Sequence, residues 1–170
     1  MRALRASLLA AIAAFAMWTS APAGAETVKV GVILPYSGPF ASLASIMDDA
    51  IKLWVKQNGA SIGPHQIELI RRDSTGPNPD VAKRLAQELI TRDGVKILTG
   101  FVFTPNALAV APLATEAKIP TVIMNAATAV ITTKSPYFAR VSLTIPQTTE
   151  IFGRWAATKG GMKRPKISVV

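Results

Sequence analysis

The stretch V-K-I-L-T-G-F-V-F-T-P-N, residues 95–106, decides how the rest of the chain is interpreted. It opens on a short apolar run typical of a buried strand, passes through Gly100, which permits a tight turn, and reaches Thr104-Pro105. A polar residue followed by proline is typical of a helix cap and the first helical position, so we predict that Thr104 caps a helix. When a strand is followed by a loop and then by the start of a helix, the unpaired backbone N–H groups of that helix lie at the carboxyl end of a parallel sheet. Small ligands bind at that end of open α/β sheets, and an anionic ligand is favoured.

Strands and helices alternate on both sides of this stretch. Apolar runs predict strands, and apolar residues spaced three and four apart predict helices. We expect strands over residues 28–34, 66–72, 96–99 and 119–124, and helices over residues 43–58, 79–93 and 105–118. This alternation predicts an α/β fold, a Rossmann-like doubly wound parallel sheet with helices on both faces. Right-handed crossovers then place four strand exits on one edge, at Pro35, Asp73, Gly100 and Asn125.

The pattern changes after Ser135-Pro136. Residues 137–143 predict a fifth strand or an extended crossover, residues 146–159 a helix, and residues 166–170 the opening of another strand. A natural domain rarely ends inside a strand without a partner or a tail, so we expect a truncated chain.

The first 25 residues have the features of a secretory signal peptide. Arg2 and Arg5 form a basic start, residues 8–18 are apolar, and Ala23-Gly24-Ala25 is a small-residue cleavage site. A membrane span needs roughly 20 apolar residues, and a core helix would not end in a cleavage site. We therefore predict a protein that is exported, cleaved before Glu26 and released in soluble form.

Composition narrows the function classes further. The 170 residues carry a net charge of +9 and contain no cysteine. The absence of cysteine excludes disulfides, thiol chemistry and a lipid-modified N-terminal cysteine. The basic residues are spread along the chain without interleaved aromatics, which argues against a nucleic-acid module and favours a surface suited to anionic solutes.

Several residues have both a functional and a structural interpretation. Thr104 fits a carboxylate ligand at a helix start and also a plain helix cap, whereas Ala126 and Thr128 fit either a ligand loop or an ordinary strand exit. Tyr36 and Phe103 fit either a pocket wall or core packing.

The charged residues and the single histidine give weaker indications of function. His65, the only histidine, is predicted to lie in a surface turn, and Asp48-Asp49 on a solvated helix face. Asp73 would either line the ligand edge or cap a turn. We expect no metal site and no cofactor. No phosphate-binding glycine motif is found in the sequence, so an enzyme is disfavoured.

Taken in order, the motifs resemble the N-terminal part of type I periplasmic solute-binding proteins of the branched-chain amino acid (leucine/isoleucine/valine-binding) family. The matching segments are residues 28–31 with 37–39, 67–69 with Asp73, 95–100, 119–120, 126–128 and 138–140. The resemblance implies two lobes that close on a solute and deliver it to an ABC permease at the inner membrane, with the protein in the periplasm. It places the first lobe at residues 26–143, and the crossover and start of an incomplete second lobe at residues 144–170.

The resemblance also implies roles for single residues. Thr104 takes the place of a hydroxyl that binds the ligand carboxylate, and Ala126 and Thr128 complete the contacts of the first lobe. Leu43 replaces a tyrosine of some amino-acid binders, and Phe103 and Tyr36 flank the same edge. The expected solute is a branched-chain or other apolar amino acid, or an aromatic acid. Alternatives are a ligand-sensing domain of a receptor or regulator with the same fold, and a Rossmann-like enzyme.

Overall fold

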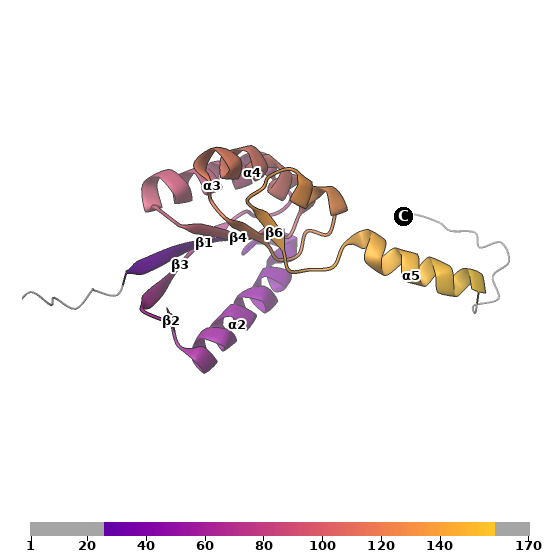
Figure 1. Ribbon diagram of the computed structural model, residues 1–170, viewed down its shortest axis with the longest axis horizontal. Coiled ribbons are helices and arrows are strands. Elements are labelled where there is room, and N and C mark those ends of the chain that lie inside the picture. The colour runs from indigo at the N-terminus through magenta and orange to yellow at the C-terminus, as the bar shows by residue number, and fades with distance from the viewer. Residues whose placement is uncertain (1–25, 159–170) are drawn as a thin grey trace, which may run out of the picture.

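The computed structural model describes residues 26–158, and within them strands and helices alternate as the sequence predicts (Figure 1). The strands are β1 (Thr27–Leu34), β2 (Ser61–Ile62), β3 (His65–Asp73), β4 (Ile97–Gly100), β5 (Thr121–Ile123) and β6 (Phe138–Arg140). The helices are α2 (Ala41–Asn58), α3 (Pro79–Glu88), α4 (Thr104–Ala117) and α5 (Ile145–Thr158). Short helical turns lie at η1 (Gly38–Phe40), η2 (Leu89–Asp93) and η3 (Ala129–Thr133). The predicted signal peptide and the predicted strand at residues 166–170 lie outside the described residues.

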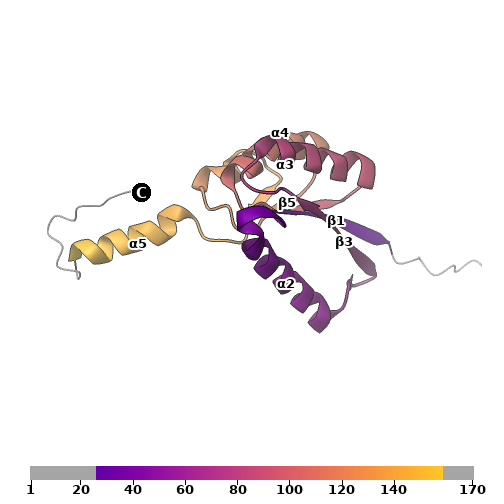
Figure 2. The ribbon, with the colours of Figure 1, turned by 180° about the vertical axis from the view of Figure 1, so that it is seen from behind.

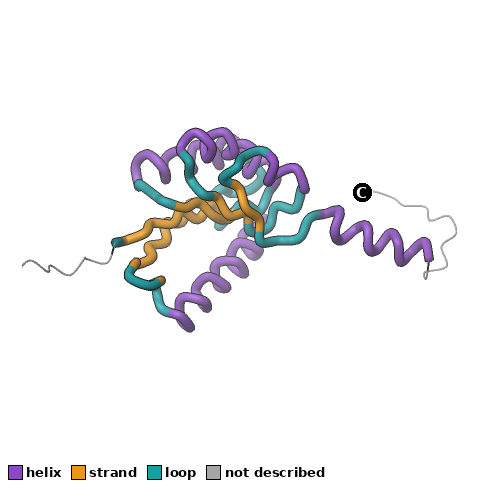
Figure 3. Tube along the Cα trace, in the orientation of Figure 1, coloured by secondary structure: helices purple, strands orange, loops and turns teal. Residues whose placement is uncertain are grey.

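The strands form one sheet in the order β2-β3-β1-β4-β5-β6, parallel except for the β2–β3 pair. The register aligns Leu34 with Asp73, Ile33 with Gly100, and Gly100 with Ile123. The predicted common edge is therefore confirmed. We call this edge, formed by the carboxyl ends of β1, β3, β4, β5 and β6 and the loops that follow them, the carboxyl edge. The chain leaves the sheet from the same edge to reach α5 (Figure 3).

Helices cover both faces of the sheet, with α3 and α4 on one side and α2 on the other (Figures 1 and 2). The larger core lies on the α3–α4 side, where α4 packs closely against α3 and buries small residues such as Ala107 and Ala114. A smaller cluster on the α2 side is built on Val32, Leu34 and Val102. Within the described residues none of the helices is both long and apolar enough to cross a bilayer.

The inward face of α2 differs from the prediction. Leu43, Met47 and Ile51 pack on the sheet as expected, but Ile46 of the same predicted stripe is 68% exposed. Asp48, predicted to be solvated, is only 5% exposed. Its burial is possible because the side chains of Tyr36, Arg71 and Lys52 satisfy its carboxylate.

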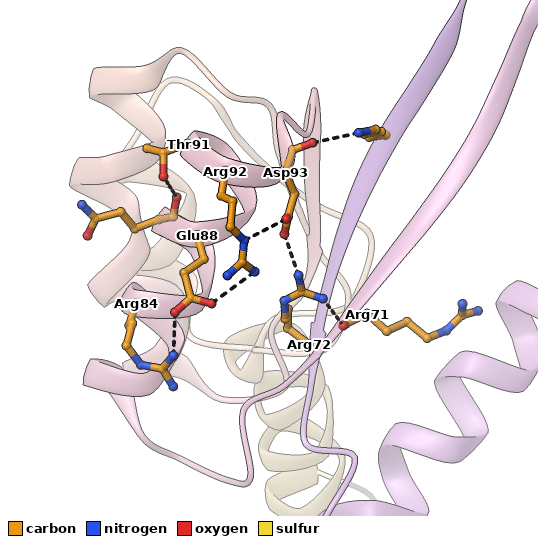
Figure 4. A network of polar contacts seen from close by, with 9 residues as sticks. Arg71, Arg72, Arg84, Glu88, Thr91, Arg92 and Asp93 are labelled. Atoms are coloured by element: carbon orange, nitrogen blue, oxygen red, sulfur yellow. Dashed lines mark hydrogen bonds and ion pairs between the residues drawn. The ribbon is translucent and has the colours of Figure 1, made fainter.

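A charged network ties the end of α3 to the sheet (Figure 4). Asp93 accepts from Arg72 of β3 at 2.6 Å and from Arg92 at 3.1 Å. Its backbone carbonyl accepts from Lys29 of β1 at 3.2 Å. Glu88 continues the network to Arg84 at 2.7 Å. These contacts hold the end of the helix that precedes β4 against the sheet. They therefore help to fix the position of β4 and of the loop that follows it at the carboxyl edge.

Candidate ligand-binding site at the carboxyl edge

Two threonines meet at the carboxyl edge. The hydroxyls of Thr104 and Thr128 lie 2.7 Å apart, and either can be the donor. Thr104 follows β4 and Thr128 follows β5, and these strands are adjacent in the sheet. Both side chains are half-buried. The structure thus brings together two residues that lie 24 positions apart in sequence and were both predicted as ligand-binding.

Thr104 is the first residue of α4 and does not cap it, which corrects the prediction. Phe103 occupies the capping position, with φ −107° and ψ 137°, and provides no side-chain hydrogen bond to the helix start. Pro105 follows within the first turn. The Thr104 hydroxyl is therefore not consumed by the helix. The first N–H groups of a helix have no intrahelical acceptor, and they carry partial positive charge that favours an anion.

A sharp backbone turn between β4 and α4 sets the position of Thr104. Gly100 has φ +113°, and a Cβ added there would lie 2.2 Å from the carbonyl oxygen of Ile33. Phe101 follows with φ +62° and is buried. Its N–H donates to the Ile33 carbonyl at 3.0 Å, and its own carbonyl accepts from the Ala126 N–H at 3.0 Å. The turn thereby fixes the loops after β1, β4 and β5 relative to one another.

Ala126 holds the loop after β5 in place through its backbone hydrogen bonds. It is buried, and the hydrogen bond to Phe101 occupies its N–H. Its carbonyl accepts from the Arg140 guanidinium at 3.2 Å and has one lone pair left. Ala126, predicted to complete the ligand contacts of the first lobe, thus offers a ligand only its carbonyl, which can accept from a donor group.

Arg140 is a functional candidate that the residue patterns did not single out. Besides Ala126, its guanidinium donates to the Thr128 carbonyl at 2.7 Å. Among residues 26–158 no carboxylate pairs with it. A half-buried cation without a counter-ion beside the threonine pair raises the local positive potential and favours an anionic guest.

Tyr36, Leu43 and Phe103 gather in one apolar cluster on the α2 side, packed against Val32 and Leu34. The Tyr36 hydroxyl donates to Asp48 at 3.2 Å. Burial raises the pKa of the Tyr36 phenol to about 12, and the neighbouring Asp48 charge acts in the same direction. Tyr36 is therefore neutral at physiological pH, and its hydroxyl is directed along α2 toward Asp48.

Phe40 was not predicted, yet it extends this cluster at the carboxyl edge. Its ring meets the Phe103 ring edge to face, with centroids 4.8 Å apart and planes at 72°. Phe40 is 37% exposed, whereas Phe103 is half-buried. A single phenylalanine in a loop gives no sequence signal for this pairing. Phe40 and Phe103 come together only because β1 and β4, the strands that precede them, are neighbours in the sheet.

The remaining predicted residues have structural roles. One Asp73 oxygen accepts from the backbone N–H groups of Tyr36, Ser37 and Thr75, at 2.8, 3.3 and 2.7 Å. Burial opposes ionisation of Asp73, but the hydrogen bonds from the Ser37 side chain and from these backbone N–H groups outweigh burial and lower the pKa of Asp73. Asp73 thus organises the turns, which is one of its two predicted roles. His65 is the half-buried first residue of β3, not a surface turn residue. Over residues 26–158, no three histidine, cysteine or acidic side chains gather into a metal-binding group.

Comparison with known proteins places this geometry in context. A family model described as periplasmic binding protein matches residues 27–167. A Leu/Ile/Val-binding protein homolog 6 from Brucella abortus is 44% identical over 162 residues, which is 95% of this chain and 41% of the relative.

Solved structures agree with this match. A solute-binding protein of an ABC transporter from Rhodopseudomonas palustris BisB5, in complex with 3,4-dihydroxybenzoic acid, is 48% identical with a TM-score of 0.77. The alignment covers 80% of this chain and 37% of that one. A second one, from R. palustris in complex with 4-hydroxybenzoate, is 47% identical with the same TM-score, over 79% of this chain and 37% of that one. The chain therefore spans about two fifths of the length of the relatives it matches.

Proposed function

The chain belongs to the periplasmic binding protein family, and we propose that it is part of the extracytoplasmic solute-binding component of an ABC importer. The proposed solute is a small carboxylate-bearing metabolite, either a branched-chain or other apolar amino acid or an aromatic acid. The named Brucella and Rhodopseudomonas relatives support both classes of solute. The proposed activity is recognition and delivery, without chemical turnover.

One observation carries the proposal. The Thr104 and Thr128 hydroxyls converge to 2.7 Å at the first turn of α4, beside the Arg140 guanidinium. Two hydroxyl donors, helix N–H groups and a nearby cation form a suitable receptor for one carboxylate group. A bound carboxylate would accept from both hydroxyls, which would then exchange their mutual hydrogen bond for two charge-assisted ones.

The rest of the site follows from the family. Residues 26–143 would form the first lobe, and residues 144–170 would begin the second, which completes the site in the full-length protein. Ala126 would contribute its carbonyl, and the cluster of Phe103, Tyr36 and Leu43 would form the apolar wall. The proposed location is the periplasm, reached by cleavage after residue 25, and the proposed partner is the permease complex at the inner membrane.

A thermal-shift screen of the full-length protein tests the function. The panel contains apolar and branched-chain amino acids, aromatic acids, and the amides of the same compounds, each at millimolar concentration. We expect at least one carboxylate to raise the unfolding temperature, because a ligand that binds only the folded state stabilises it. Its amide should fail to do so. Stabilisation by no carboxylate, or equally by amide and acid, would contradict the proposal.

A further inference from the structure

An aromatic pair lies at the carboxyl edge, and one of its members, Phe103, directly precedes Thr104 in sequence. Phe40 of η1 and Phe103, which precedes α4, meet edge to face at 4.8 Å between ring centroids. This arrangement brings the positive edge of one ring to the negative face of the other, and it leaves further ring surface to be matched by a third aromatic group.

The loops around Phe40 hold its ring in this place. On one side lies Phe103, which is packed into the cluster under α2. On another side lies Gly76, where an added Cβ would be 3.9 Å from the Phe40 ring. The Gly76 carbonyl accepts from the buried Asn106 amide at 2.9 Å, which ties the β3–α3 loop to α4. Phe40 is therefore bounded by two neighbouring loops, and 37% of its surface is exposed.

The order of the strands divides the carboxyl edge into two halves. The loops after β1 and β4 supply the Phe40–Phe103 pair, and the loops after β4 and β5 supply the Thr104–Thr128 pair. Phe103 and Thr104 are adjacent in sequence, so the aromatic pair and the hydroxyl pair are joined through the loop between β4 and α4. If the carboxylate of a solute binds at the Thr104–Thr128 pair, the rest of the solute can extend toward the Phe40–Phe103 pair.

Resting on the carboxylate-binding function proposed above, we infer that Phe40 is a specificity-determining residue that selects an aromatic carboxylate over an aliphatic one of similar size. A flat ring can add to the edge-to-face arrangement of Phe40 and Phe103. A puckered alkyl ring or a branched chain buries similar area but lacks the ring quadrupole. The preference resides in Phe40 because Phe103 is already engaged in the cluster under α2.

Isothermal titration of the full-length protein with benzoate and cyclohexanecarboxylate tests this inference, since the two ligands share the carboxylate and the ring size. The wild type should bind benzoate more tightly. Phe40→Leu should reduce the ratio of the two dissociation constants about 2- to 10-fold, the range of an aromatic pair contribution. Phe40→Tyr should retain the ratio. Trp54→Leu, which removes a partly exposed aromatic ring on α2, should also retain it.

The outcomes separate this inference from the proposed function. If the wild type binds both carboxylates equally, or if Phe40→Leu weakens both by the same factor, the selective role of Phe40 is wrong while carboxylate binding stands. If the wild type prefers L-leucine to benzoate, the inference is also overturned. If no carboxylate binds the wild type, both proposals fail. Thermal unfolding of each unliganded variant shows whether a change in the ratio accompanies a loss of folding.

Discussion

Gly100 is the residue on which the geometry of the carboxyl edge most depends. Its φ of +113° is a conformation that residues with a Cβ rarely adopt, and a Cβ would overlap the Ile33 carbonyl at 2.2 Å. The atom in the way belongs to the backbone of β1, so it cannot rotate aside. Substitution must therefore separate β1 from β4, the two strands that deliver Tyr36 and Thr104.

We predict that Gly100→Ala lowers the free energy of unfolding by at least about 2 kcal/mol, because it combines backbone strain with an overlap inside the sheet. Gly94→Ala is the matched control. Gly94 also has a positive φ, +69°, but nothing lies within 4 Å of an added Cβ. Gly94→Ala should lower the free energy of unfolding by only about 1 kcal/mol. Urea unfolding measures both, and equal effects would show that the overlap at Gly100 is relieved without cost.

Asp48 links stability to pH. It lies almost buried, with Arg71 at 2.6 Å and Lys52 at 3.1 Å from its oxygens. Burial opposes its ionisation, but the hydrogen bonds from Arg71 and Lys52 outweigh burial and lower its pKa. A carboxylate with a lowered folded-state pKa stabilises the fold above its unfolded pKa, near 3.9, and loses that contribution as pH falls through the folded value.

We predict that Asp48→Asn lowers the free energy of unfolding at pH 7 by about 1–2 kcal/mol, less than for a fully buried ion pair because Arg71 is partly exposed. The difference from the wild type should shrink as pH falls below about 4, because the unfolded wild type then takes up a proton on Asp48 before the folded protein does. Asp49→Asn, on the exposed neighbour, is the control and should have little effect. A difference that is constant from pH 7 to pH 3 would contradict the assigned ionisation.

Single residues were predictable where a local pattern carried them. Thr104 stood out because Thr-Pro opens a helical pattern, whereas the role of Thr128 was implied by the family resemblance. Phe40 and Arg140 were missed, because their importance comes from contacts with other loops that no local pattern encodes. Phe40 meets Phe103 of the loop after β4, and Arg140 bonds carbonyls of the loop after β5. Asp48 was misplaced because a helical stripe indicates where apolar residues lie and cannot indicate that a carboxylate will meet an arginine of β3.

At the scale of elements, the sequence predicted the parallel sheet well. Buried runs of valine, isoleucine and leucine mark the central strands β1 and β4, and the proline and glycine residues between elements mark their ends. The two-residue β2 was missed because it is too short for an alternation to be seen. The helix after β4 begins one residue earlier than predicted, at Thr104, and this shift frees the hydroxyl for the candidate site.

The β6 strand contributes to the site through Arg140. Because its guanidinium joins the carbonyls of Ala126 and Thr128, it both positions the loop after β5 and adds positive charge beside the threonine pair. We predict that Arg140→Gln weakens binding of a carboxylate solute by about 1 kcal/mol, the order expected for charges several ångströms apart near a protein surface. The loss should be larger at low salt.

Titration at two ionic strengths checks the role of Arg140. Arg154→Gln is the matched control, since Arg154 of α5 is exposed and pairs with Glu150 in its own helix. If Arg140→Gln binds as tightly as the wild type at low salt, the electrostatic role is wrong. If its loss of affinity does not depend on salt, the residue acts only by holding the loop.

At the scale of the whole molecule, the described part is one lobe with an extension. Helix α5 leads away from the sheet and its helices (Figure 1). It carries exposed apolar side chains, among them Ile151 at 72% and Phe152 at 62% exposure. The family resemblance, the fold and the common edge were all predictable from the sequence.

The central claim is that Thr104 and Thr128 hold the carboxylate of the solute. Isothermal titration of the full-length protein with its best carboxylate ligand from the screen, comparing the wild type with Thr104→Ala, tests it most directly. Thr91→Ala, which removes a hydroxyl bonded only to its own helix, is the control. We expect Thr104→Ala to weaken binding by about 1–3 kcal/mol, the cost of removing one hydrogen bond to a charged acceptor, and Thr91→Ala to leave affinity unchanged. If Thr104→Ala binds the ligand as tightly as the wild type, Thr104 does not hold the carboxylate.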